Sequence, residues 1–422
     1  MSDFLAKRRA RVAAALPLGD AVLVVGAGAP VPLPENTDQI YPFRAHTEYY
    51  YLTALECPHG VVAYDPHDGA WHSFVPTVTE AERVWEGREQ PPGVALAGLA
   101  PWLTARHGRP IAALGTPPAG VMADATLTLK IREAFTHARR PKDAVELSLL
   151  RRSAAITAAG YARLPSLLQP GLTERAVQVE LEAEFFRHGA TRTGYGSIVG
   201  LGRNSAVLHF EPGARRAQAG DFVLIDAGAE LDRYVTDVTR TYVIGEPGDF
   251  QRDLYQIVLA AEERAITRCV PGAEWRDLHL AAAVEMTAGL VSLGVLHGQP
   301  ESLVEQEAHT LFFPHGLGHM VGLGVRDAGG QLPGRPKDPR PSLQTLRLDL
   351  PLAPGYVVTV EPGLYFIPAL LNDPARRARY RDCVNWPLVE SHLALGGVRI
   401  EDNILVTEAG PENLTAAIPK EL

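Results

Sequence analysis

Two strand-like runs within residues 222–243, joined by a short polar turn, restrict the fold more than any other feature of this chain. Their apolar, β-branched and aromatic residues predict an antiparallel hairpin. In such a hairpin Asp226 and Asp237 would lie opposite each other on one face, where two carboxylates repel unless a cation lies between them. The alternative is that Asp226 caps a turn while Asp237 pairs with Arg233 or Arg240.

A glycine-rich segment at residues 314–319 places two histidines four positions apart. That spacing is typical of a metal-binding helix face, but Gly316 and Gly318 make a helix unfavourable. We therefore expect an extended loop that directs His315 and His319 towards a cavity. The alternative is an ordinary turn with incidental histidines.

Two glutamates follow apolar strand-like runs at residues 357–363 and 397–403. Glu361 lies where a strand meets a Pro-Gly turn, a costly place for a charge without a partner. Alternation puts Glu401 on the same face as Arg399. Glu361 could instead bond turn amides, and Glu401 could pair with Arg399. Taken together, four carboxylates and one imidazole suit two ions of Mn²⁺, Co²⁺ or Zn²⁺.

These five residues and their motifs resemble the metal-ligand set of the pita-bread metallopeptidases, the clan of methionine aminopeptidase and the Xaa-Pro peptidases. The motifs are IDAGAE at Asp226, TDVTRT at Asp237, HGLGH at His319, VEPGLYF at Glu361 and GGVRIEDN at Glu401. The match spans about residues 143 to 415. Within the clan, the C-terminal motifs look more similar to prolidase than to aminopeptidase P.

The resemblance implies a role for each ligand. Asp226 binds one ion, His319 and Glu361 bind the other, and Asp237 and Glu401 bridge the two. The cofactors implied are two divalent ions, with Mn²⁺ the first choice and Co²⁺ or Zn²⁺ the alternatives. A hydroxide bridging the ions would attack the peptide bond preceding proline.

The resemblance also implies residues that act on the substrate. Glu361 would carry a proton to the leaving nitrogen, and His209 and His315 would stabilise the oxyanion or hold the substrate. Tyr195 and Arg399 match substrate-pocket positions. Without the resemblance, His209 would be interpreted as a core histidine on a strand.

Two positions depart from the family pattern. The histidine expected seven residues after His319 is replaced by Arg326, and the arginine that binds a proline carboxylate in prolidases is replaced by Gln344, although Arg347 is retained. Arg326 could bind that carboxylate instead, because a guanidinium matches its geometry. Dipeptides and longer Xaa-Pro peptides are both open as substrates.

The chain is predicted to have an α/β N-terminal domain at residues 1–140 and an α+β pita-bread catalytic domain at residues 141–422. Pro and charge interrupt the pattern between them, and Asp143 with Glu146 predicts a capped helix start. Strands are expected at residues 21–25, 49–52, 61–64 and 111–114. Later segments predict helices at 143–168, 173–188 and 250–296, strands between 194 and 245, and a Pro-rich surface excursion at 333–354.

Charge and composition exclude several classes of function. The formal net charge is -9 and no basic block is present, so nucleic acid is not an expected partner. Apolar runs are too short to span a membrane, and three dispersed cysteines suit a cytoplasmic protein. We expect short proline-containing peptides as substrates and, by resemblance, a homodimer. A catalytically silent peptide-binding module and a phosphotriesterase side activity are the other possibilities.

Overall fold

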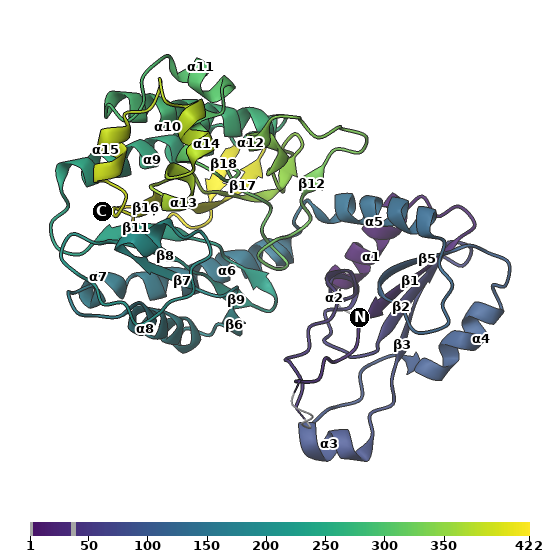
Figure 1. Cartoon of the computed structure of the whole chain (residues 1–422). Coiled ribbons are helices and arrows are strands. Elements are labelled where there is room, and N and C mark those ends of the chain that lie inside the picture. The colour runs from purple at the N-terminus through teal and green to yellow at the C-terminus, as the bar shows by residue number, and fades with distance from the viewer. Residues whose placement is uncertain (1–2, 35–38) are drawn as a thin grey trace. The chain divides into compact units, whose positions relative to one another are not determined.

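The computed structural model describes residues 3–34 and 39–422, and the chain divides into two compact units, residues 1–139 and 140–422 (Figure 1). Among the described residues, every helix is too short or too polar to span a bilayer.

The first unit is an α/β domain built on one mixed five-stranded sheet of order β4-β3-β2-β1-β5. The interior strand β1 pairs antiparallel with β2 and parallel with β5, and its six residues are all buried. The strands are β1 (Val22–Ala27), β2 (Val61–Asp65), β3 (Ala70–Val75), β4 (Val94–Ala95) and β5 (Ile111–Thr116). The helices are α1 (Asp3–Ala15), α2 (Thr47–Thr53), α3 (Glu80–Glu86), α4 (Leu99–Thr104) and α5 (Ala125–Arg139), with the short 3₁₀ helix η1 (Leu96–Gly98).

The strand predicted at residues 49–52 is wrong, because these residues belong to α2. Tyr49, Leu52 and Thr53 are buried at the spacing of one helical face, and Ala54 ends the helix in the left-handed conformation with φ 53°. Burial of that face outweighs the strand preference of consecutive tyrosines.

The second unit repeats the order helices, then strands. Helices α6 and α8 share a core with β7 and β8, and helices α9 and α10 cover the other half (Figure 1). The first half comprises α6 (Ala144–Tyr161), α7 (Leu164–Leu167), α8 (Glu174–Arg187), β6 (Arg192–Thr193), β7 (Ile198–Leu201), η2 (Gly202–Ala206), β8 (Phe222–Asp226), β9 (Ala229–Leu231), β10 (Tyr234–Val235) and β11 (Thr239–Val243). The second comprises α9 (Asp249–Thr267), α10 (Trp275–Ser292), α11 (Pro300–Glu305), η3 (Ala308–Leu311), β12 (Gly330–Gln331), α12 (Pro341–Gln344), β13 (Leu348–Asp349), β14 (Val357–Val360), β15 (Gly363–Tyr365), α13 (Pro368–Leu371), α14 (Pro374–Arg379), α15 (Trp386–Ser391), β16 (Gly397–Arg399), β17 (Asp402–Thr407) and β18 (Gly410–Asn413).

The predicted helix start at Asp143 is confirmed. Its carboxylate accepts hydrogen bonds from the backbone N–H groups of Val145 at 3.0 Å and Glu146 at 2.9 Å, and Glu146 accepts the N–H of Asp143 at 2.9 Å. This reciprocal capping fixes where α6 begins.

The predicted hairpin is present, but the predicted pairing of its two aspartates is wrong. Asp232 and Arg233 form the turn with φ of 49° and 75°, and β11 then pairs with β8 so that Asp226 lies opposite Thr239. Asp237 lies in the break between β10 and β11 rather than in the ladder. That break lets the aspartate leave the regular alternation of a strand.

The Pro-rich segment is only partly the surface excursion that was predicted. Its second half carries five buried leucines into the core of the unit, at positions 343, 346, 348, 350 and 352. Arg335 in its first half is held by Glu274 at 2.8 Å and Asp349 at 3.0 Å. The prolines of this segment predicted a surface excursion, but its leucines are part of the core.

Candidate metal centre

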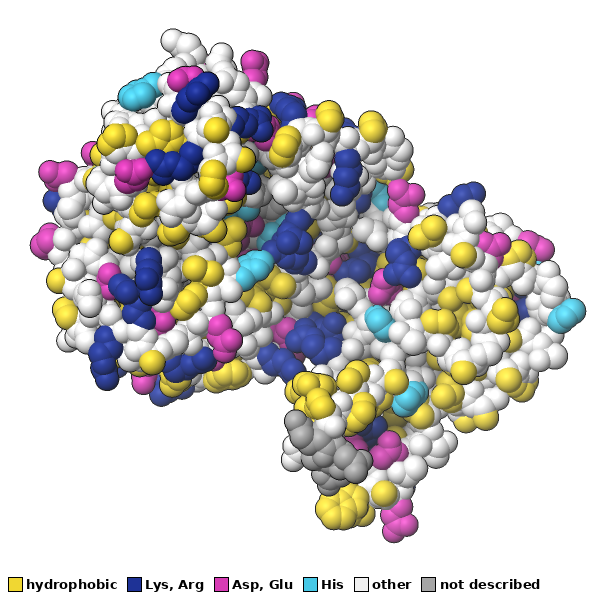
Figure 2. All heavy atoms as spheres, viewed as in Figure 1, with side chains coloured by type: hydrophobic (Ala, Val, Ile, Leu, Met, Phe, Trp, Pro, Cys, Tyr) yellow, Lys and Arg dark blue, Asp and Glu magenta, His cyan; other side chains and the backbone are white. Residues whose placement is uncertain are grey.

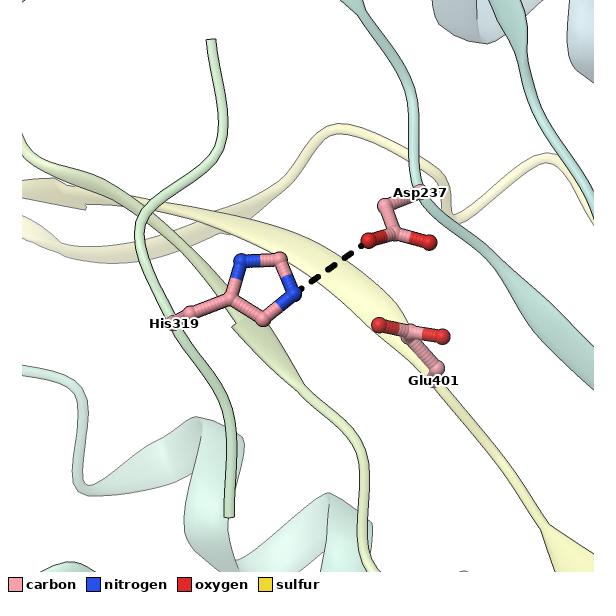
Figure 3. A group of neighbouring side chains, drawn as sticks. All are labelled: Asp237, His319 and Glu401. Atoms are coloured by element: carbon pink, nitrogen blue, oxygen red, sulfur yellow. Dashed lines mark ion pairs between the residues drawn. The ribbon is translucent and has the colours of Figure 1, made fainter. Parts of the chain in front are cut away.

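Three side chains from distant parts of the chain converge at the base of one cavity. Asp237, His319 and Glu401 offer ligand atoms that all lie within 4.8 Å of one another, and all three are buried. Figure 3 shows them pointing towards a common point from a break between strands, a loop and the residue that precedes β17.

The other two predicted ligands line the same cavity. Asp226 ends β8 and Glu361 follows β14. The His319 Nε2 atom lies 3.4 Å from Asp237 Oδ2 and 3.6 Å from Glu361 Oε1. All five residues predicted to bind metal therefore border a single cavity of about 770 Å³.

The electrostatics of this cluster fit divalent cations. Burial, and then repulsion from the other carboxylates, raises the pKa of Glu401 well above its usual range. Burial likewise raises the pKa of Asp226 and of Glu361, although positively charged Arg399 opposes the shift in both. Four neighbouring carboxylates with little exposure can ionise together only beside compensating positive charge, and oxygen donors with one imidazole suit first-row divalent ions.

Hydrogen bonds orient the predicted ligands. His319 Nδ1–H donates to the Met320 carbonyl at 3.0 Å, which leaves the Nε2 lone pair directed at the carboxylates. Thr239 donates to Glu401 Oε2 at 2.7 Å, and Tyr195 donates to Asp226 Oδ1 at 2.6 Å. Sequence reasoning found Tyr195 by family resemblance but missed Thr239, because a buried threonine on a strand carries no distinctive signal.

The loop that carries His319 has the predicted extended form, and one glycine shows why. A Cβ atom at Gly318 would lie 2.1 Å from the carbonyl oxygen of Thr359. Only glycine allows the loop to approach β14 this closely, and the Thr359 N–H then donates to the His319 carbonyl at 2.8 Å. The glycines that argued against a helix therefore position the imidazole.

A chain of hydrogen bonds connects Asp226 with His315. Arg399 donates to Asp226 Oδ2 at 2.6 Å and to the Tyr365 hydroxyl at 2.9 Å. His315 Nδ1–H donates to the Gly316 carbonyl at 2.8 Å, so its Nε2 accepts the Tyr365 O–H at 2.9 Å. Burial lowers the pKa of His315 to about 3, so this imidazole stays neutral at ordinary pH. Sequence reasoning did not assign a role to Tyr365.

Arginine side chains line the cavity, and Figure 2 shows Lys and Arg side chains in dark blue on the face of the second unit that it draws. Exposed Arg326 and Arg347 both line the cavity, and neither forms an ion pair with a carboxylate within the described ranges. Burial and then the charge of Arg326 lower the pKa of Arg347, so the two cations lie close together. His209 is on an exposed turn of the same rim rather than on the strand of the alternative interpretation.

Gln344 does not contribute to this rim. Its amide donates to the Pro339 carbonyl at 3.0 Å, and it is absent from the residues that border the cavity. Arg347, three residues later, is the residue of this segment that reaches the cavity together with Thr345. The predicted loss of an arginine at Gln344 therefore leaves the basic character of the cavity intact.

Four carboxylates and one imidazole, gathered at the base of a cavity by an α+β unit that repeats its helix and strand order, define a metal-dependent hydrolase. The chain belongs to metallopeptidase family M24, whose model matches residues 148–408. Residues 5–99 match the aminopeptidase P N-terminal domain.

Curated relatives and solved structures agree with that assignment. A probable Xaa-Pro aminopeptidase of Coccidioides posadasii is 31% identical over 424 residues, covering 93% of this chain and 89% of that protein. Aminopeptidase P from Escherichia coli with the inhibitor Pro-Leu has 29% identity and a TM-score of 0.80, covering 99% of this chain and 95% of that one. Proline aminopeptidase P II from Yersinia pestis has 29% identity and a TM-score of 0.80, covering 100% and 98%.

The predicted closer resemblance to prolidase is not supported. The N-terminal domain match and these relatives point to aminopeptidase P. The motifs that favoured prolidase are residues 206–210, the segment after Glu361, Asn385–Trp386 and the segment around Glu401. Those next to the ligands belong to a metal site that the clan shares, so they carry little information about the length of the substrate.

Proposed function

We propose that this protein is an Xaa-Pro aminopeptidase, which hydrolyses the bond between an N-terminal residue and proline in short peptides. The observation that carries the proposal is the convergence of Asp226, Asp237, His319, Glu361 and Glu401 on one cavity large enough for a small peptide. The choice of Xaa-Pro peptides as substrates is supported by the relatives, which include a probable Xaa-Pro aminopeptidase and aminopeptidase P.

The five ligands would hold two divalent ions, with Asp237 and Glu401 between them. When bound, such ions lower the pKa of water and polarise a carbonyl oxygen. We propose Mn²⁺ as the native metal, with Co²⁺ and Zn²⁺ as alternatives, because the donor set accepts all three.

Glu361 is the residue we assign to proton transfer. Its side chain is 19% exposed to the cavity against 7% for Asp237, so it can reach a substrate atom while it remains next to His319. A carboxyl group that borders the cavity can take up a proton and release it to the leaving nitrogen.

His209 and His315 would contact the substrate from two sides. His315 is neutral and held by Tyr365, so it presents a fixed polar ring to the cavity, whereas His209 lies on an exposed turn. We propose that the two imidazoles hold the peptide and stabilise the oxyanion, with Tyr195 and Arg399 bordering the same space.

The test is an assay on Ala-Pro-Ala, Ala-Pro and Ala-Ala, with metal-stripped protein before and after addition of Mn²⁺. We expect turnover of Ala-Pro-Ala only with metal, and none of Ala-Ala. Hydrolysis that persists after complete chelation would contradict the metal mechanism. Turnover of Ala-Ala at the same rate would contradict the proline specificity.

A specific observation keeps Xaa-Pro dipeptidase activity as the second candidate. The arginines Arg326 and Arg347 border the cavity without a carboxylate partner in the described part of the chain. The free carboxylate of a C-terminal proline would satisfy them through charge-assisted hydrogen bonds. A longer peptide places its carboxylate farther from the metal centre.

Replacing Arg326 with alanine is expected to separate these two candidates. If Arg326 binds the proline carboxylate, kcat/KM for Ala-Pro should fall by about 10-fold or more, the value of one hydrogen bond to a charged group, while Ala-Pro-Ala is less affected. The measurement is the ratio of the two kcat/KM values in variant and wild type. An unchanged ratio would show that Arg326 does not bind the carboxylate of the C-terminal proline.

A further inference from the structure

Directly behind the candidate metal centre lies a second set of buried charges. Asp402, the first residue of β17, directly follows Glu401, and the two neighbouring side chains contact different groups: Glu401 lines the cavity and Asp402 binds Arg240. On the side away from the cavity, Asp402 meets Arg240, Lys420 and, through Lys420, Glu262. We call these four residues the rear charge layer. Arg240, Asp402 and Glu262 are at most 1% exposed.

Arg240 connects this layer with the metal ligands. Its Nη1 donates to the carbonyl oxygens of Glu401 at 2.8 Å and Thr239 at 2.9 Å, and its Nη2 donates to Asp402 Oδ1 at 2.8 Å. The Glu401 N–H donates to the Thr239 carbonyl at 3.1 Å, which joins the two strands at the same point. The guanidinium therefore fixes the backbone of Glu401 and the start of β11, two residues after Asp237.

Lys420 completes the charge balance of the layer. Its Nζ lies 2.6 Å from Asp402 Oδ2 and 2.7 Å from Glu262 Oε2. The segment that carries it is held closely, because Arg240 donates to the carbonyls of Ile418 at 2.8 Å and Pro419 at 2.9 Å. Lys420, whose side chain is 18% exposed, thus bridges the carboxyl groups of Asp402 and Glu262.

We propose that Lys420 is a positioning residue for the metal ligand Glu401, acting through Asp402 and Arg240. This inference rests on the proposed metal centre. Without the ammonium group, Asp402 Oδ2 would lose its charged partner and keep only the Asn413 amide at 2.7 Å, so the buried carboxylate would draw Arg240 away from the carbonyl oxygen of Glu401. The backbone at Glu401 would then lose the contact that sets its position relative to Asp237.

A purely structural role for Lys420 predicts a different result. If Lys420 only attaches residues 418–420 to the fold, its loss lowers the free energy of unfolding but leaves a folded metal centre unchanged. If Lys420 positions Glu401, the affinity for metal falls even where the protein is fully folded. Binding of Mn²⁺ alone therefore distinguishes the two roles without any measurement of activity.

The experiment measures Mn²⁺ affinity of metal-stripped full-length protein by calorimetry, with the electron paramagnetic resonance spectrum of bound Mn²⁺ as a second signal. The test variants are Lys420→Met, Lys420→Gln and Lys420→Arg, of which Lys420→Gln keeps an amide donor for the two carboxyl groups. The control is Lys337→Met, at an exposed lysine of the same unit. We expect about 10-fold weaker binding in Lys420→Met and Lys420→Gln, since partners beyond the ligands typically contribute 10- to 100-fold. Lys420→Arg should restore most of the affinity, and Lys337→Met should match wild type.

The outcomes are distinct. Wild-type protein that binds no Mn²⁺ would overturn the proposed metal centre itself. The second outcome is that wild-type protein binds Mn²⁺ tightly and a folded Lys420→Met or Lys420→Gln variant binds it with an affinity within about twofold of wild type. That result would overturn only the role of Lys420. The double variant Lys420→Met with Glu262→Gln should bind Mn²⁺ as weakly as Lys420→Met, and recovery of affinity there would overturn the lost contact with Asp402 as the cause.

Discussion

Replacing Asp237 with asparagine is expected to abolish peptide hydrolysis, with kcat/KM for Ala-Pro-Ala reduced by at least about 10³-fold, as for other residues that act as one catalytic unit. Asp237 lies within 4.8 Å of both His319 and Glu401, in the cluster that we propose holds the ions. The amide of asparagine keeps the shape of the aspartate side chain but removes its negative charge and replaces one oxygen ligand atom with a nitrogen that binds metal poorly. The measurement is steady-state turnover at saturating Mn²⁺.

The same substitution separates function from stability. Because Asp237 repels Glu401 and Glu361 in the metal-free protein, Asp237→Asn should unfold at the same urea concentration as wild type or at a higher one. Asp249→Asn, at a carboxylate that is 97% exposed, serves as the control and should be fully active. Activity within tenfold of wild type in Asp237→Asn would contradict its role as a ligand.

Replacing Arg399 with methionine is expected to cost about 3–5 kcal/mol of unfolding free energy in the metal-free protein. The guanidinium is 4% exposed and lies 2.6 Å from Asp226 Oδ2, so its loss leaves a buried carboxylate without its cation. It also removes the donor that holds Tyr365 against His315. Urea unfolding followed by circular dichroism gives the value.

A surface pair provides the matched comparison for that experiment. Arg151 and Glu412 are 48% and 44% exposed and 2.9 Å apart, so Arg151→Met should cost less than about 1 kcal/mol. If Arg399→Met is no more damaging than Arg151→Met, Asp226 must be protonated and neutral in the metal-free protein, and the buried ion pair would not support the site.

Local patterns in the sequence predicted several elements correctly. The Asp143 capping box, the extended loop at residues 314–319 and the hairpin after Asp226 all depend on a few neighbouring residues with strong conformational preferences. The helix at Tyr49–Leu52 was missed because consecutive tyrosines favour strands locally, while the burial that decides the helix comes from the rest of the domain.

The sequence by itself determined the identity of the five candidate ligands, because side-chain chemistry and motif order are written in the chain. Only the tertiary structure decided how they meet: Asp226 pairs with Thr239 rather than Asp237, and Arg399 bonds Tyr365 and Asp226 rather than Glu401. The rear charge layer of Arg240, Asp402, Glu262 and Lys420 was equally hidden. Its members are up to 180 residues apart, and long-range contacts of single charged side chains leave no periodicity or motif from which they could be predicted.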